Sequence, residues 1–383
     1  MSTLTELKHQ IRLTTKVILI ALVLFIGYRI AVKIFQRTPP VPPKPKPNVL
    51  FGKLPFPQFE PIALLLSQNM IYELDLLTPS LPESPEKVYV YPAISLSASL
   101  FGPERDKKVA ANYGFLGEPQ NISETTYSWN DQENSRTFEI NLFTRAYTLT
   151  FDWKKNPDSI TSGAIKSESQ AENLAIGLLK QSGIFPPDLN QGKRTVALLK
   201  LVGGEIRQID KNEEASLARV DFFRQDVDKL SVYTSNPKKG SPSILLTSNS
   251  DSKKQILSLE YSFWNYDFTS QHLAEYPLKS SDEAWMEIQS GGGAMVYFNL
   301  VGLDPNIPYT STTILKIRVK KVILGYYDSK EQQPYLEPIY VFECEAFLEG
   351  DKKGELTIYL PAITNDWLTT PEPTTETTET SSQ

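Results

Sequence analysis

An apolar stretch near the N-terminus constrains this chain more than any other feature. Val17 to Tyr28 carry no charge, and the stretch extends to Phe35 if Arg29 and Lys33 are included. As a helix these nineteen residues would span about 28 Å, close to the thickness of a bilayer core. Both cations lie in the last two turns, where long side chains can reach the lipid headgroups. We therefore expect residues 17–35 to cross a lipid bilayer once.

Two alternatives are a buried core helix and a cleaved signal peptide. The stretch is terminal, flanked by cations and followed by prolines, which disfavours a core helix, and no small-residue cleavage site follows Gly27. Flanking Lys and Arg residues, which are more numerous after the stretch, favour a cytoplasmic location for the large C-terminal part. Long domains can nevertheless cross regardless of flanking charge, so we expect that part to be extracytoplasmic, and a cytosol-facing scaffold stays open.

The composition beyond the anchor is that of a folded protein. The chain has 383 residues, of which 40% are hydrophobic, and a net charge of −6, which argues against nucleic-acid binding. The single cysteine, Cys344, excludes an internal disulfide and a cysteine-based metal cluster. Only His9 and His272 could supply imidazoles, and His9 precedes the anchor. We therefore expect no catalytic residues, no metal and no cofactor.

Proline content and low complexity divide the chain into five parts. Six prolines between Thr38 and Pro47 favour an extended polyproline spacer, with a ligand for an SH3-type domain as the alternative. The Thr-, Glu- and Pro-rich C-terminus is typical of disorder. The expected parts are a cytoplasmic tip and transmembrane anchor (1–37), a Pro-rich stalk (38–57), an N-terminal α+β module (58–160), a C-terminal α+β region with two helix-meander units (161–368) and a disordered tail (369–383).

Helical and strand patterns alternate three times after the stalk. The first expected helix covers residues 97–113 and precedes strands with alternating apolar residues. Ser167 with Gln170, and Ser280 with Glu283, have the spacing of capping boxes at the starts of two further helices. Each is again followed by alternating segments. We therefore predict an α+β fold of repeated helix-plus-antiparallel-sheet modules, in which a sheet has one wet face.

Three segments of the second half carry a resemblance to a known class of proteins. They are Ala218–Arg224, Tyr276–Trp285, and Leu324–Asp328 leading to Tyr335–Phe342. Over about residues 160–360 the chain resembles extracytoplasmic regulators of the YycH/YycI type and, more loosely, PepSY-type modules. The resemblance implies a single-pass membrane protein whose outer domain senses or regulates by binding another protein. It carries over no catalytic residues.

A dense aromatic run is the candidate binding feature. It comprises Tyr261, Phe263, Trp264 and Tyr266, which could line a groove for a glycan or a peptide. The same pattern is common among cross-strand pairs of a hydrophobic core. Both interpretations stay open.

Other candidate sites have plainer structural explanations. Gly291–Gly293 follows a helix, which indicates a C-terminal cap rather than a phosphate loop. Cys344 lies on one strand face with apolar neighbours and is expected to be buried. Glu343 and Glu345 would lie about 7 Å apart on the other face. A charge ladder with Lys316, Arg318 and Lys320 of a neighbouring strand explains them best.

These observations favour a non-catalytic protein of the cell membrane. We expect a single-pass, outward-facing protein that binds the bilayer through residues 17–35 and binds or regulates a protein partner in the cell envelope. The alternative is a cell-envelope hydrolase that uses a pair of carboxylates.

Overall fold

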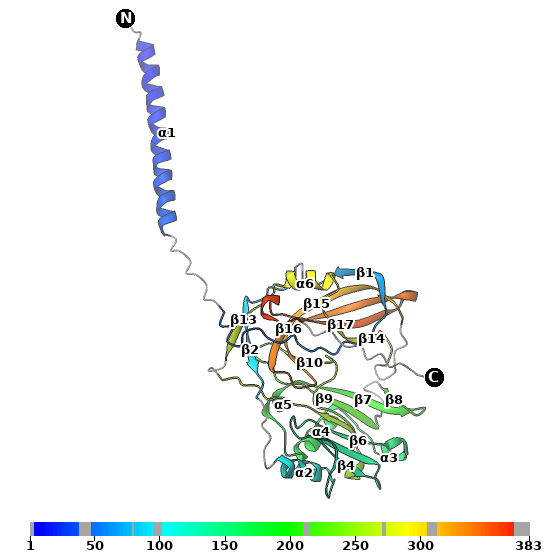
Figure 1. Cartoon of the computed structure of the whole chain (residues 1–383). Coiled ribbons are helices and arrows are strands. Elements are labelled where there is room, and N and C mark those ends of the chain that lie inside the picture. Colours follow the sequence, from blue (N-terminus) through cyan, green and yellow to red (C-terminus); the bar gives the residue numbers. More distant parts are fainter. Residues whose placement is uncertain are drawn as a thin grey trace. The chain divides into compact units, whose positions relative to one another are not determined.

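A computed structural model describes residues 4–37, 47–78, 80–94, 102–155, 157–161, 163–209, 214–269, 273–304 and 312–370. The chain forms two compact units, Met1–Lys46 and Pro47–Gln383 (Figure 1). The first holds one helix, and the second is a mixture of helices and strands in which sheets predominate. The α+β class is therefore confirmed.

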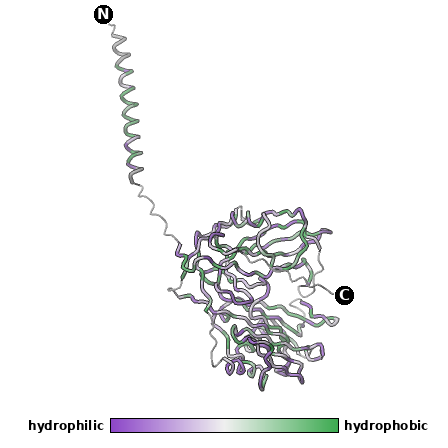
Figure 2. The backbone as a smooth tube through the Cα atoms, viewed as in Figure 1, coloured by the Kyte–Doolittle hydropathy of each residue, from purple (hydrophilic) through white to green (hydrophobic). Residues whose placement is uncertain are grey.

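The first unit contains helix α1 (Leu4–Arg37). Its segment Ile11–Lys33 is long and apolar enough to cross a membrane, and none of that segment is buried. Figure 2 shows hydrophobic residues along most of this helix. The expected anchor, residues 17–35, lies within α1.

One sheet of the second unit has eight strands, five of them in the order β1-β15-β16-β17-β14. Strand β1 is parallel to the long strand β15, as is the short strand β10, and all other pairs are antiparallel. Helix α6 (Ser281–Gln289) packs on one face through Ala284 and Ile288. The strands are β1 (Leu66–Leu74), β2 (Lys87–Pro92), β10 (Val232–Thr234), β13 (Ala274–Pro277), β14 (Ala294–Leu300), β15 (Ile314–Asp328), β16 (Tyr335–Leu348) and β17 (Lys353–Pro361).

The other sheet has nine antiparallel strands in the order β3-β4-β5-β6-β12-β11-β9-β7-β8. Helices α2 (Gly102–Asn112) and α4 (Glu168–Gln181) share a hydrophobic core with one face of this sheet. The short helices α3 (Asp158–Thr161) and α5 (Pro187–Gln191) come directly before and after α4 in the chain. The strands are β3 (Gln120–Ser123), β4 (Thr126–Asp131), β5 (Arg136–Asn141), β6 (Tyr147–Phe151), β7 (Arg194–Val202), β8 (Glu205–Gln208), β9 (Leu217–Phe222), β11 (Ser243–Thr247) and β12 (Ile256–Tyr261).

The sheets do not follow the expected boundary between residues 160 and 161. Strand β6, before the boundary, pairs with β12, after it, so the first two helix-meander units form one sheet. Strands β1 and β2 of the expected first module belong instead to the eight-stranded sheet. The long-range pairings therefore cut across the expected modules, and a division into repeats is not confirmed.

Local signals located two helix starts correctly. Ser280 and Glu283 form a reciprocal capping box at α6. Ser167 caps α4 by accepting a hydrogen bond from the Gln170 amide, whereas the Gln170 side chain accepts from the Lys166 amide. The expected helix 97–113 is observed as α2 from Gly102, and residues 95–101 lie outside the described part. After α6, Gly291 and Gly293 both have φ of +87°, as expected for a helix-ending turn.

The expected stalk, residues 38–57, extends too far toward the C-terminus. Pro47–Pro57 belong to the folded unit, where Leu54 is fully buried and forms a parallel bridge with Leu368. The Thr369 amide donates to the Leu54 carbonyl at 2.8 Å. Burial of Leu54 therefore attaches this proline-containing segment to the folded unit. Residues 38–46 of the stalk, residues 371–383 of the tail and His272 lie outside the described residues.

Candidate ligand-binding cleft between the two sheets

The floor of the cleft is the face of the nine-stranded sheet opposite α2 and α4. Side chains directly opposite each other in antiparallel strands project from the same face. The register places one polar residue from each of six adjacent strands in a single transverse row. That row, the polar row, is Glu139, Thr148, Glu260, Ser243, Asp221 and Thr195.

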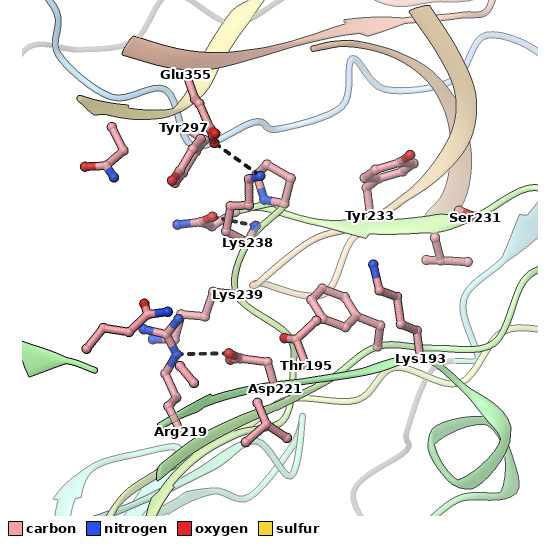
Figure 3. Close-up of a pocket in the computed structure, with 18 of the residues that line it drawn as sticks. Lys193, Thr195, Arg219, Asp221, Ser231, Tyr233, Lys238, Lys239, Tyr297 and Glu355 are labelled. Atoms are coloured by element: carbon pink, nitrogen blue, oxygen red, sulfur yellow. Dashed lines mark hydrogen bonds and ion pairs between the residues drawn. The ribbon is translucent and has the colours of Figure 1, made fainter. Parts of the chain in front are cut away.

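The first part of the cleft lies at the Thr195 end of the polar row. It has a volume of about 690 Å³ and is lined on the opposite side by β10 and by the ends of β14 and β17. Tyr297 and Asn299 of β14 line it, and Asn299 is in register with Glu355 of β17. Lys238 pairs with Glu355 at 3.4 Å and lies 5.6 Å from the Tyr297 ring centroid (Figure 3).

A loop of residues 235–241 divides the cleft. Gly240 packs against β9 so closely that a Cβ would lie 2.4 Å from the Phe222 carbonyl oxygen, which requires glycine there. The Gly240 amide donates to the buried Asp221 carboxylate at 3.2 Å, and that carboxylate also accepts from Arg219 Nε at 2.9 Å. The loop is therefore held on the floor at Gly240, by its close packing against Phe222 and by its hydrogen bond to Asp221.

The second part of the cleft lies at the Glu139 end, beyond this loop. Its volume is about 630 Å³, and its floor is β5, β6 and β12. Glu60 and residues 328–331 line it from the side of the eight-stranded sheet. The hydroxyl side chains of Thr148, Thr150 and Ser258 line the floor and make it polar.

The two parts carry opposite charge. The lining of the first part has five basic residues and three acidic ones, namely Lys193, Arg219, Arg224, Lys238 and Lys239 against Asp221, Asp226 and Glu355. The second part has five acidic residues and two basic ones, namely Glu60, Glu139, Glu260, Asp328 and Glu331 against Lys239 and Lys330. Lys239 of the dividing loop lines both parts and pairs with Glu260 at 2.7 Å.

Each end of the polar row has an unpaired charge. Lys193, two residues before Thr195, extends from the floor into the first part (Figure 3). Glu139 occupies the opposite end, in the second part. Within the described ranges neither side chain forms an ion pair or hydrogen bond. A ligand could therefore engage both without breaking an existing contact.

Arg224 joins the two sheets beside the cleft. Its side chain is only 2% exposed and donates to Asp188 at 2.9 Å and to Asp328, at the end of β15, at 3.2 Å. It also donates to the Trp264 carbonyl, and its guanidinium carbon lies 4.1 Å from the Phe263 ring centroid. The buried charge is thus compensated from both sheets.

The aromatic run 261–266 contributes mainly to the core. Tyr261, Trp264 and Tyr266 are 5%, 2% and 5% exposed, and Phe263 is partly buried. Tyr261 stacks on Tyr147 at a centroid distance of 4.6 Å, and the Trp264 indole donates to the Ser329 carbonyl. These four side chains therefore do not form an exposed binding surface, although Tyr261 lies at the edge of the second part.

Two further sequence expectations concern β15 and β16. Arg318 is opposite Glu345 in these antiparallel strands and lies 3.7 Å from it, which confirms one pair of the expected charge ladder. Lys316 and Lys320 pair instead with Glu73 of β1 and with Asp75, which follows β1. Cys344 is buried with Phe342 and Ala346 in the core under α6, and burial raises the pKa of its thiol. Its thiol is therefore protonated at neutral pH, as fits a core residue.

Burial also shifts the pKa of groups in and near the cleft. It raises the pKa of Tyr233, in the first part, to about 12. Glu337 of β16, outside the cleft, is 2% exposed, and within the described part its carboxylate oxygens have no hydrogen-bond partner. Burial raises the pKa of Glu337 well above its ordinary value of 4.5. Among the residues that the structure describes, no group of three His, Cys, Asp or Glu side chains is arranged to hold a metal ion.

Comparison with known proteins does not assign a family. No protein-family model matches the chain, and no curated protein matches it. A crystal structure of an uncharacterized protein from Eubacterium rectale is similar, with a TM-score of 0.42 and 13% sequence identity. The match covers 78% of this chain and 90% of that chain. A similarity this distant assigns no function.

Sequence reasoning did not find the cleft. Its lining comes from segments as far apart as Glu60 and Glu355, and no local pattern shows that these meet. The one available signal was the alternation along β6, in which Thr148 and Thr150 separate apolar residues. That alternation predicted a wet face but not the second sheet that lies over part of it.

Proposed function

We propose that this chain is a single-pass membrane protein whose folded unit, Pro47–Gln383, lies outside the cytoplasm and binds a protein partner in the cell envelope without turning it over. The observation that carries the proposal is the segment Ile11–Lys33, a helix of membrane-crossing length and composition that is not buried by the rest of the chain. The exposed apolar side chains of this helix are unfavourable in water and favourable in lipid.

The cleft supports the binding part of this proposal. Its two parts have the volumes of ligand sites, and rigid strands form the floor. The charged and hydroxyl side chains that line it suit a polar partner. The resemblance to YycH/YycI-type regulators points the same way and stays a prediction. Residues 38–46 would then form the spacer between membrane and folded unit.

Topology is tested by adding protease to intact cells and to permeabilised cells and following the C-terminal tail. We expect cleavage of the tail in intact cells. Protection in intact cells with cleavage after permeabilisation would place the folded unit in the cytoplasm and refute the outward-facing part of the proposal.

Partner binding is tested by site-specific photo-crosslinking in living cells. Val301 is 66% exposed and lines the cleft, and Leu116 is 81% exposed and does not. A photoreactive residue at position 301 should give a discrete protein adduct, and the same residue at position 116 should not. Equal adducts at both positions, or none at position 301, would argue against a partner at the cleft.

A carboxylate-pair hydrolase is the second candidate, because Glu139 and Glu260 flank Thr148 in the polar row. Two inter-strand spacings separate their Cα atoms by about 10 Å, and flexible side chains could bring the carboxyls to the separation of inverting glycosidases. Wall-polymer hydrolysis that disappears in both Glu139→Gln and Glu260→Gln, while folding persists, would favour this candidate over binding.

A further inference from the structure

The length of the polar row sets the size of a ligand that could occupy the cleft. Five inter-strand spacings of about 4.8 Å separate Glu139 from Thr195, which gives about 24 Å. An extended polypeptide rises about 3.3 Å per residue, so at least seven residues are needed to reach from one end of the row to the other. Asp221 and Ser243, in the middle of the row, are buried. Such a segment would therefore contact floor side chains in each part and pass over the dividing loop between them.

The charge distribution selects among ligands of that length. The Lys193 end is lined by an excess of basic residues, and the Glu139 end by an excess of acidic ones. A glycan with charges of one sign complements only one of these ends. A polypeptide can present an acidic and a basic side chain seven or more residues apart and can complement both.

The remaining lining suits a peptide backbone. Thr148 and Thr195 in the row, and Asn299 across the cleft, supply hydroxyl and amide groups that both donate and accept hydrogen bonds. Tyr297 adds an aromatic ring beside Lys238. These groups recognise amide units without fixing a sequence, so the terminal charges would determine specificity.

We propose that the cleft binds an extended polypeptide segment of at least seven residues that places an acidic side chain beside Lys193 and a basic side chain beside Glu139. This proposal rests on the proposed binding function and names the chemistry of the partner. The segment passes the dividing loop, where Asn236 and Lys239 line both parts of the cleft.

The test uses full-length protein in detergent and fluorescent nine-residue peptides, with binding measured by anisotropy. The dipolar peptide has two glutamates at one end, two lysines at the other and serine or threonine between. A composition-matched control has one glutamate and one lysine at each end, and two more peptides are acidic or basic at both ends. We expect the dipolar peptide to bind more tightly than all three others.

Single substitutions at the two ends assign the binding to the cleft. Lys193→Gln and Glu139→Gln should each weaken the dipolar peptide by about two- to fivefold, the range for one partly exposed ion pair, and the double variant by about the product. Of these two substitutions, only Lys193→Gln should weaken binding of the peptide that is acidic at both ends. Lys200→Gln, later on the same strand β7, and Glu133→Gln, in the turn before β5, carry exposed charges outside the cleft and should change nothing.

Three results would overturn the proposal. The first is equal affinity for the dipolar and composition-matched peptides, and the second is no change in the Lys193 and Glu139 variants. The third is binding of polygalacturonate that depends on Lys193 but not on Glu139, without binding of the dipolar peptide, which would assign the cleft to an anionic glycan. If these occur while photo-crosslinking at position 301 still captures a protein, the peptide proposal fails and the proposed binding function stands.

Discussion

Replacement of Arg224 by methionine tests how the two sheets are held together. Methionine keeps most of the apolar stem and removes the guanidinium, which donates to Asp188, Asp328 and the Trp264 carbonyl. Asp188 belongs to α5, beside the nine-stranded sheet, whereas Asp328 ends β15 of the eight-stranded sheet. The substitution therefore removes a link between layers as well as a buried charge.

The expected cost follows from what the substitution leaves behind. Removing one partner of a buried ion pair costs about 3–5 kcal/mol, because the other charge stays buried and unpaired. Asp188 is 27% exposed, so water can replace part of its lost contact. Asp328 is 13% exposed and keeps a hydrogen bond from the Tyr266 hydroxyl at 2.9 Å. We therefore expect a loss near the lower limit, about 3 kcal/mol.

Urea unfolding of the detergent-solubilised protein, followed by far-ultraviolet circular dichroism and tryptophan fluorescence, measures this loss. Arg207→Met is the matched control, because Arg207 is 47% exposed and pairs with an exposed glutamate, Glu205. That control should cost less than 1 kcal/mol. A loss in Arg224→Met no larger than in Arg207→Met would refute the argument that this guanidinium joins the sheets.

Three further substitutions test other parts of the structure. Because burial raises the pKa of Glu337, its contribution to the free energy of unfolding is greatest below the ordinary pKa of 4.5 and falls as pH rises toward the folded-state pKa. Glu337→Gln should therefore remove a slope of about 1.4 kcal/mol per pH unit from the plot of unfolding free energy against pH. Parallel plots for the two proteins would contradict this. Leu54→Ala removes a fully buried side chain and should cost about 2–5 kcal/mol in urea unfolding, and an unchanged midpoint would count against its burial. Leu24→Lys places a charge at the centre of the apolar helix at a cost of about 3 kcal/mol and should lower the membrane-bound fraction in flotation, whereas Ser2→Lys should not.

Local features of this fold could be predicted from the sequence, because neighbouring residues determine them. The Ser280 cap depends on Glu283 three residues later, and the burial of Cys344 depends on alternation along one strand. The same applies to the apolar helix, which needs only composition and length.

Long-range pairing could not be predicted in this way. Strand β1 pairs in parallel with β15, which begins 240 residues after it, and β10 leaves the nine-stranded region to join the eight-stranded sheet. Strand β12 then returns to pair with β6. The cleft depends on these pairings, since Lys193 and Tyr297 line the same cavity only after both sheets have formed. The aromatic run illustrates the same limit, because its composition suits a surface or a core, and only its long-range contacts with Tyr147, Arg224 and Ser329 decide.

The bridge between Leu54 and Leu368 has a mechanical consequence. The segments that enter and leave the folded unit are fastened to each other there, by the bridge and by the Thr369–Leu54 hydrogen bond. Tension applied through the residues before Pro47 would first load the hydrogen bonds of Asn48 and Gly52 to β13, and then the Leu54–Leu368 bridge, before it reached β15 or β16. The long pairing of β15 with β16 would therefore persist under a pull that had already begun to open these outer contacts.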